Sequence, residues 1–190
     1  MLSMRVLRHQ CIWRICDRTK ISPMPLHQCH SINAQPITAE AFAAYGQVIA
    51  ATPDSKPFDY RDAQLDLSQG TPRFYIMRLP YQGLRFHQIT RHQRCTQCLG
   101  ALAGKSWFIG VAAPTSDHKP NLSTLKAFLI PGTCFVKLHK GTWHAGPYFQ
   151  GEWADFYNLE LADTNQVDHD TYNLLTTHGY ELEIVPTVSA

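Results

Sequence analysis

Short β-type runs separated by turns dominate this sequence and constrain its fold more than any other feature. In "TLKAFLIPGTCFVKL", Pro131-Gly132 is a turn pair between two such runs. One helix is predicted over "AEAFAAY", where Thr38 can cap the N-terminus and Gly46 ends the helix. Many short strands without interleaved helices favour a β-sandwich or a β-barrel. The predicted strands are 73–79, 84–89, 107–113, 125–130, 134–138, 153–162 and 180–185.

The charge distribution separates the first 30 residues from the rest. Residues 1–30 hold five basic residues and one acid, whereas the remainder carries a net charge of −2 within a total of +2. An Arg-rich, acid-poor start is typical of an organelle-targeting segment, and the alternative is a disordered or over-extended start with Met24 as the initiator. We therefore expect an N-terminal extension over 1–30 and a single domain over 31–190. We expect this domain in the cytoplasm, unless the extension directs it to an organelle.

Composition argues against several classes of function. The slightly acidic body has no basic stripe that would bind nucleic acid. The uncharged apolar runs fall far short of the about 18 residues that cross a membrane. The sequence also contains no nucleotide-binding motif. A small molecule is therefore the expected partner.

Cys95 and Cys98 form a lone CxxC in "CTQC". A zinc ribbon needs a second such pair, and a thioredoxin-like site needs the pair at a strand-to-helix turn. Neither condition is met, because a Gly- and Ala-rich segment and a strand follow. We interpret both thiols as reduced and structural.

The stretch "KLHKGTWHAGP" places His139 and His144 on either side of Gly141. Five residues is a poor spacing for a shared helix face or strand face, and Gly141 can adopt the backbone angles of a turn. We therefore expect a strand–turn–strand unit. The pair indicates either a metal or acid/base site or polar residues at a strand turn. The pKa of an unperturbed imidazole, about 6.5, suits proton transfer near neutral pH.

Two spacings along the chain match a known pattern. His92 is followed after four residues by Gln97 and after six more by Gly104, and Gly141 is followed after two residues by His144. These spacings resemble the two motifs of the cupin superfamily. Within it, the chain is most similar to the ureidoglycolate lyase family, in "PITAEAFAAYGQVI", "TRHQRCTQCLG", "LSTLKAFLIPG", "KLHKGTWHAGP" and "ADFYNLEL". The resemblance runs from about residue 35 to about residue 157. It implies an all-β, cupin-type jelly-roll β-barrel with one or two short helices.

The resemblance also implies an activity and a set of site residues. The family splits ureidoglycolate, an intermediate of allantoin and purine breakdown, into glyoxylate and urea, without a redox cofactor. It implies a homodimer, with His92, Gln97 and His144 as catalytic residues and as candidate ligands of one divalent metal ion. A cation must hold the substrate carboxylate, and two side chains on one face of a late strand can line the pocket. The candidate substrate-binding residues are Arg91, Lys137, His139, Lys140, Asp155 and Tyr157.

The chain departs from the family pattern at two positions. Thr90 stands where the family has an acidic residue, and Ala145 replaces a second histidine. Two imidazoles and an amide bind a divalent ion weakly. A non-catalytic small-molecule-binding or regulatory cupin therefore stays open as an alternative. A metal-dependent oxygenase is disfavoured, because such cupins usually use three histidines and a carboxylate.

Overall fold

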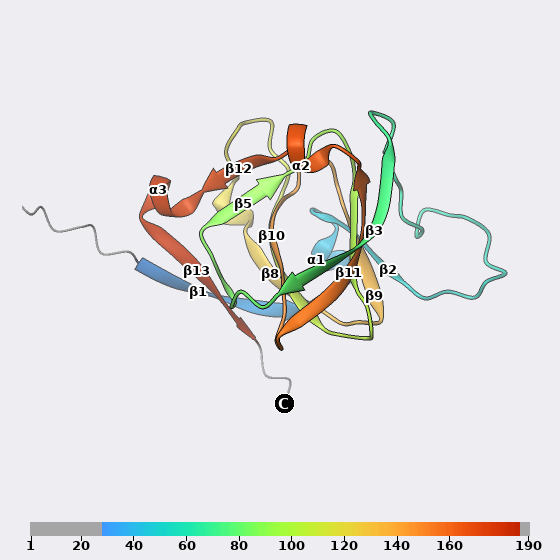
Figure 1. Ribbon diagram of the computed structural model, residues 1–190, viewed down its shortest axis with the longest axis horizontal. Coiled ribbons are helices and arrows are strands. Elements are labelled where there is room, and N and C mark those ends of the chain that lie inside the picture. The colour runs from blue at the N-terminus through green and yellow to red at the C-terminus, as the bar shows by residue number, and fades with distance from the viewer. Residues whose placement is uncertain (1–27, 187–190) are drawn as a thin grey trace, which may run out of the picture.

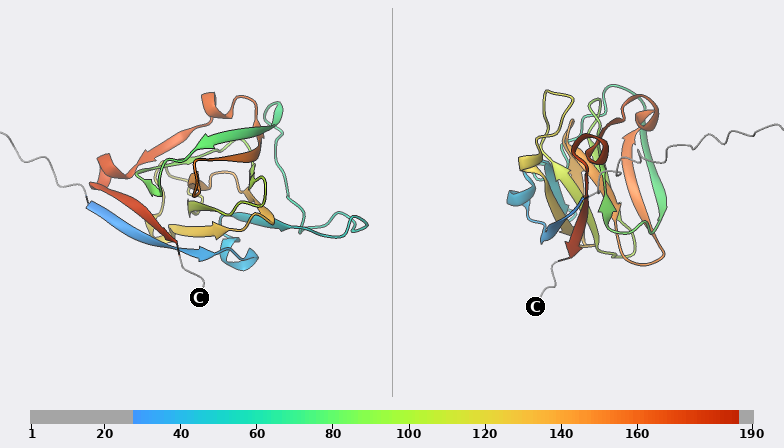
Figure 2. Two further views of the ribbon diagram at one scale, coloured as in Figure 1. Left: turned by 60° about the horizontal axis from the view of Figure 1, so that its bottom comes forward. Right: turned by 90° about the vertical axis from the view of Figure 1, so that its left-hand side faces the viewer.

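Two curved β-sheets face each other in the computed structural model, which describes residues 28–186 (Figures 1 and 2). The eight-stranded sheet holds, in spatial order, β12 (Asp170–Asn173), β5 (Gln88–Arg91), β10 (Trp143–Tyr148), β7 (Trp107–Ala112), β8 (Lys126–Ile130), β1 (Gln28–Pro36), β13 (Tyr180–Pro186) and β4 (Arg85–Phe86). The five-stranded sheet holds β2 (Gly46–Ala50), β9 (Cys134–Leu138), β6 (Gln97–Ala101), β11 (Trp153–Leu161) and β3 (Pro72–Pro80).

Most neighbouring strands are antiparallel, and β1 alone pairs in parallel, with β13 on one side and β8 on the other, among the strands described. The helical segments are short: α1 (Ala39–Phe42), the 3-10 helix η1 (Leu122–Thr124), α2 (Thr164–Val167) and α3 (Leu174–His178). The all-β, cupin-type jelly roll with short helices is confirmed. No helix of residues 28–186 has the length and apolar character needed to cross a membrane.

Local chemistry explains where α1 begins and how β2 joins the sheet. The Thr38 hydroxyl accepts a hydrogen bond from the Ala41 amide at 3.1 Å, as predicted for the N-cap. The helix ends at Phe42, earlier than the predicted end at Gly46. Gly46 instead opens β2, where an added Cβ would lie 2.0 Å from the Lys137 carbonyl oxygen. The glycine therefore allows β2 to approach β9 closely.

The predicted strand over 84–89 is two strands in the structure. β4 pairs with β13, whereas β5 pairs with β12 and β10. His87 lies between them, and its carbonyl accepts a hydrogen bond from the Leu174 amide at 2.7 Å. At His87 this hydrogen bond replaces a bond between neighbouring strands. The single predicted strand is therefore divided, and its two halves pair with different strands of the sheet.

β1 begins at Gln28, three residues before the expected start of the domain at residue 31. Its first residues pair in register with β13, Gln28 opposite Tyr180. The predicted extension therefore contributes its last three residues to the sheet. Its remaining part, and with it the targeting interpretation, lies outside the described residues.

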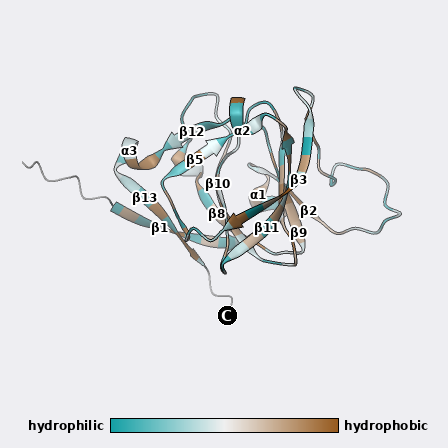
Figure 3. Ribbon diagram, viewed as in Figure 1, coloured by the Kyte–Doolittle hydropathy of each residue, from teal (hydrophilic) through white to brown (hydrophobic). Residues whose placement is uncertain are grey.

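Both faces of β7 are buried, and they belong to two separate cores. Trp107, Ile109 and Val111 point between the two sheets, where they pack with residues of β6, β8, β9 and β11. Phe108 and Ala112 point to the opposite face of the eight-stranded sheet. The strands carry hydrophobic and hydrophilic residues in mixed order (Figure 3), as expected where sheet faces differ in exposure. The inner core leaves a cavity between the two sheets.

Candidate active site

A cavity of about 270 Å³ lies between the sheets and is called here the histidine cavity. Within the described part of the chain, one acidic side chain and no lysine or arginine line it. The polar side chains in its wall are Tyr75, Gln82, His92, Gln97, His144, Tyr148, Asn158, Glu160, Asn165 and His169.

Strand register places His144 in this cavity. His144 pairs with Val111 of β7 and with Thr90 of β5, and Val111 belongs to the core between the sheets. Antiparallel partners point to the same side of a sheet, so His144 points inward. Trp143, one residue earlier, points to the other face and is fully buried in the core there.

His92 follows β5 and reaches the same cavity. It is buried, and its Nδ1 donates a hydrogen bond to the backbone carbonyl of Asp168. The Asp168 carboxylate in turn accepts from the amides of Gln93 and Arg94, both at 2.8 Å. These contacts hold the segment after β5, and the Gly141 amide donates to the His92 carbonyl at 2.6 Å. Gly141 has a φ of +79°, as expected for the predicted turn.

The two rings form the centre of the site, with centroids 5.1 Å apart. Burial lowers the pKa of His92, and burial together with the neighbouring His92 lowers the pKa of His144 to about 3. Both imidazoles are therefore neutral near pH 7. His144 Nδ1 donates to the Thr142 carbonyl at 3.2 Å. Within residues 28–186 no hydrogen-bond partner meets Nε2 of either ring, so each offers a free lone pair.

Gln97 joins a buried polar network on the opposite sheet. Its Nε2 donates to Glu160 Oε2 at 3.0 Å and to Asn158 Oδ1 at 3.2 Å. Tyr75 adds its hydroxyl, which donates to Glu160 Oε1 at 3.2 Å and accepts from Asn158 Nδ2 at 3.1 Å. These bonds fix the amide orientation of Gln97. Its Oε1 is buried and has no partner among the described residues, so it is an acceptor available to a ligand.

The structure brings His92, Gln97 and His144 together as predicted, but the other candidates lie elsewhere. Arg91 points away from the cavity, bonds Asp170 at 2.9 Å and lies over the ring of Trp143 at 4.4 Å. Arg91 and His92 are adjacent in the sequence, and successive residues of a strand point to opposite faces.

Lys137 and His139 contact each other on the outer side of the five-stranded sheet, and Lys140 is paired with Asp66 on the surface. None of the three lines the histidine cavity, although His139 lines a small adjoining pocket together with His92, Gln97 and His144. Contact of these three side chains with a bound ligand stays a prediction.

Asp155 and Tyr157 share one face of β11, as predicted, but it is the outer face. Asp155 forms a two-bond ion pair with Arg78, both bonds at 2.8 Å. The Tyr157 ring packs against Phe135 with centroids 5.8 Å apart. Neither side chain lines the cavity, and the alternate face of β11 does.

Three functional candidates were missed from the sequence: Asn158 and Glu160 on the inner face of β11, and His169. The apolar pair Ala154 and Phe156 marks the inner face, and the same two-residue period leads to Asn158 and Glu160. His169 gave no such signal, because it lies in the connection before β12. Its ring centroid is 5.7 Å from that of His92.

The residues present do not form a strong metal site. In the part of the chain that the structure describes, no group of three or more His, Cys, Asp or Glu side chains could hold a metal ion. His92, His144 and Gln97 supply two imidazoles and one amide oxygen. Catalytic divalent sites usually take three strong protein ligands. This donor set does not fit such a site.

Comparison with known proteins decides the family. A family model described as ureidoglycolate lyase matches residues 58–183. The chain belongs to the ureidoglycolate lyase family. Ureidoglycolate lyases from Escherichia coli (strain K12 / DH10B) and Shigella boydii serotype 18 are each 30% identical over 146 residues, which cover 70% of this chain and 89% of the relative. The predicted family and enzyme class, a lyase, are confirmed.

The solved structures that align with this ureidoglycolate lyase family member have lower sequence identity than these relatives. Oxalate decarboxylase from Bacillus subtilis aligns with a TM-score of 0.37 and 14% identity, over 74% of this chain and 29% of that one. A dTDP-4-dehydrorhamnose 3,5-epimerase from Elizabethkingia anophelis aligns with a TM-score of 0.30 and 15% identity, over 57% and 53%. The chain spans about a third of the oxalate decarboxylase chain.

Proposed function

We propose that this protein splits ureidoglycolate into glyoxylate and urea by proton transfer in the histidine cavity. Two neutral imidazoles with free Nε2 atoms, 5.1 Å apart between ring centroids, carry this proposal. Family membership supplies the substrate class. The substrate is a carbinolamide, so its cleavage needs a base for the hydroxyl proton and an acid for the departing nitrogen.

The proton path uses His92 as a shuttle. Its Nδ1–H is held by the Asp168 carbonyl, so Nε2 takes the proton from the substrate hydroxyl. The carbonyl of glyoxylate forms as the carbon–nitrogen bond breaks, and the bonding electron pair goes to the urea nitrogen. The same proton then passes from His92 to that nitrogen, which leaves His92 neutral again. His144 accepts a hydrogen bond at Nε2 from the substrate and orients it.

The polar network on the facing sheet suits the ureido group. Gln97 Oε1 is an unpartnered buried acceptor, and a ureido group offers N–H donors. Glu160 fixes Gln97 from behind through the 3.0 Å bond to Nε2. A matched acceptor favours a ureido substrate over one without N–H groups, because the acceptor would otherwise stay unsatisfied.

Arg73 is the proposed cation for the substrate carboxylate. It lies opposite Glu160 in the β3–β11 register, so the two side chains share the inner side of the sheet. Its guanidinium lies 3.6 Å from the centroid of the Tyr75 ring, and Tyr75 lines the cavity. This position at the rim suits a substrate whose carboxylate faces the solvent.

We further propose a cytoplasmic homodimer that acts in allantoin and purine nitrogen breakdown. The outer face of β3 carries Phe74 and Ile76, which are 71% and 62% exposed, next to Tyr157 of β11. Exposed apolar side chains grouped on one sheet face favour association with a second copy. Sedimentation of the purified protein tests the dimer.

The experiment that tests the function measures urea and glyoxylate released from ureidoglycolate by the purified protein. Equal amounts of the two products support the lyase. Binding of glyoxylate without turnover would instead support the non-catalytic binding cupin. Metal analysis of the same sample tests the candidate divalent ion, since the donor set described above predicts weak retention.

A further inference from the structure

A second groove, of about 630 Å³, lies at the edge formed by β2 and is called here the β2 groove. Its walls come from α1, β2, the end of β9 and the segment 52–64. It shares no lining residue with the histidine cavity. Its size falls in the range of small-molecule sites, about 300–1,000 Å³.

Lys137 lies at the bottom of this groove and is only 2% exposed. In the register of β6 and β9, Lys137 pairs with Cys98 on the outer side of the sheet, while Leu138 pairs with Gln97 on the inner side. The five-stranded sheet therefore separates Lys137 from the histidine cavity. Lys137 belongs to this groove rather than to the cavity, whereas His139 lines both this groove and a small pocket beside His92 and His144.

The Lys137 ammonium has unused hydrogen-bonding capacity. Its Nζ donates to His139 Nδ1 at 3.0 Å, and the other ring nitrogen, Nε2, donates to the Ala43 carbonyl at 3.3 Å. His139 is therefore a neutral acceptor and does not offset the charge. No carboxylate is paired with Lys137 in the described part of the chain. Burial lowers the pKa of Lys137, as it does for a cation with no counter-ion.

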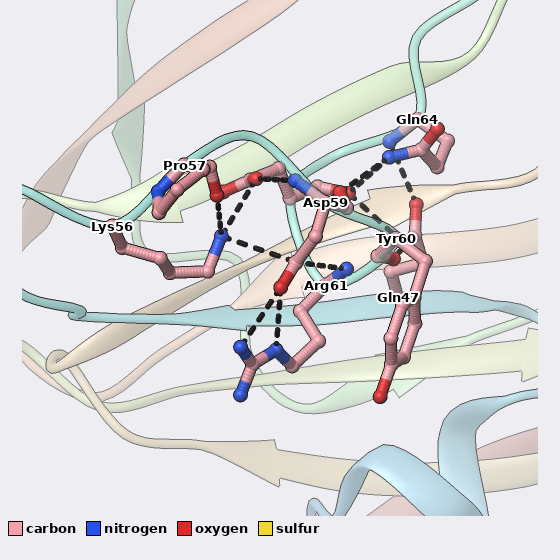
Figure 4. A network of polar contacts seen from close by, with 8 residues as sticks. Gln47, Lys56, Pro57, Asp59, Tyr60, Arg61 and Gln64 are labelled. Carbon is pink, nitrogen blue, oxygen red and sulfur yellow. Dashed lines mark hydrogen bonds and ion pairs between the residues drawn. The ribbon is translucent and has the colours of Figure 1, made fainter.

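Hydrogen bonds and ion pairs hold the outer wall of the groove in place (Figure 4). Gln47 of β2 donates from Nε2 to the carbonyls of Tyr60 and Asp62 at 3.0 and 3.2 Å, and its Oε1 accepts from the Gln64 amide at 2.9 Å. Asp59 holds Arg61 through two bonds, at 2.8 and 3.0 Å. The segment that forms this wall is thus tied to the strand beneath it.

Charge and polarity of the lining define the ligand. The described lining contains two cationic side chains, Lys137 and Arg61, and no Asp or Glu. The remaining wall is largely apolar, with Ala39, Ala43 and Val48. We propose that the β2 groove is a second binding site, which takes a small carboxylate carried on an apolar body. The carboxylate meets Lys137, and the apolar body packs on α1 and β2.

The test uses phenylacetate as the probe and phenylacetamide as its neutral counterpart, with binding followed by amide chemical shifts in the folded full-length protein. We expect phenylacetate to shift the Ala39 and Val48 amides and to bind more tightly than phenylacetamide. Lys137→Met keeps an unbranched side chain of similar length and removes the charge, so phenylacetate should bind about 10–100-fold more weakly. Lys126→Met, an exposed lysine of the other sheet, is the matched control and should leave binding unchanged.

A second variant keeps the test decisive if Lys137→Met does not fold. Ala43→Leu fills the groove from the exposed end of α1 and should also weaken phenylacetate binding. Turnover of ureidoglycolate should stay near wild type in Ala43→Leu, because Ala43 does not line the histidine cavity. Equal affinity for phenylacetate and phenylacetamide would overturn the proposal. So would phenylacetate binding that is lost in His92→Asn but kept in Lys137→Met.

Discussion

His92 and His144 come from the two separated sequence motifs, and their rings meet with centroids 5.1 Å apart and an angle of 57° between the ring planes. Each ring is held at Nδ1 by a backbone carbonyl, of Asp168 and Thr142 respectively. Both therefore present Nε2 to the same cavity. The motif spacing thus brings together the two imidazoles that the proposed chemistry needs.

The free energy of unfolding should decrease as the pH is lowered below about 6.5. The pKa of His144 is lowered to about 3 in the folded state, and the pKa of His92 is lowered too, so the unfolded chain binds protons that the folded chain does not. The contribution of each histidine is fully present above about pH 6.5 and is lost as the pH falls, for His144 as the pH approaches 3. Each histidine adds a slope of at most about 1.4 kcal/mol per pH unit. Urea unfolding between pH 7 and pH 4 measures this slope, and an unchanged slope in His144→Asn would contradict the assignment.

Arg73 should control substrate affinity more than turnover. Arg73→Met removes the proposed partner of the substrate carboxylate, so KM should rise about 10–100-fold with a smaller change in kcat. Arg85→Met is the matched comparison, because Arg85 is also exposed and lines a neighbouring pocket that shares His144 with the histidine cavity. Steady-state kinetics on both variants checks this. A KM effect confined to Arg85→Met would assign the carboxylate to the other arginine.

The sequence predicted the three cavity residues because motif spacing fixes which strands carry them. His92, Gln97 and His144 each lie where the register of β5, β6 and β10 directs them inward. Arg91, the neighbour of His92, was also a candidate but points away from the cavity, since a shift of one residue along a strand reverses the face. Spacing alone does not tell which of two neighbouring residues points inward.

The hydrogen-bond network that holds Gln97 could not be predicted from the sequence, for a different reason. Glu160 and Asn158 meet Gln97 only through the pairing of β6 with β11, which is a contact between segments far apart in the sequence. Local periodicity carries no information about such pairing. The strands β1, β2, β6 and β12 also lie outside the predicted strands.

The CxxC cysteines should prove dispensable for activity. Burial raises the pKa of Cys98 to about 11, and burial raises the pKa of Cys95 as well, so both thiols are protonated near neutral pH. The double variant Cys95→Ser with Cys98→Ser should keep turnover within a few-fold of wild type. Some loss of stability is expected, because a buried hydroxyl replaces a thiol. Loss of turnover with the fold intact, as judged by circular dichroism, would make the thiols functional.

A shortened chain tests the boundary of the domain. A chain that begins at Met24 keeps all of β1, which starts at Gln28, and should unfold cooperatively with the stability of the full chain. A chain that begins at Ile37 lacks β1, which lies between β8 and β13, and should not fold. Thermal unfolding compares the two. A clear loss of stability in the chain from Met24 would show that residues before it pack on the domain.

Urea release from ureidoglycolate by the wild type, His92→Asn and His144→Asn tests the central claim most directly. An asparagine can keep a hydrogen bond but cannot accept and return a proton near neutral pH. Acid/base groups typically contribute about 10²–10⁴-fold, so His92→Asn should lower kcat by about that factor, with thermal stability at pH 7 near wild type. His144→Asn should retain more activity than His92→Asn, because its proposed role is orientation. Near-wild-type turnover in His92→Asn would contradict proton transfer by this histidine, whatever the activity of His144→Asn.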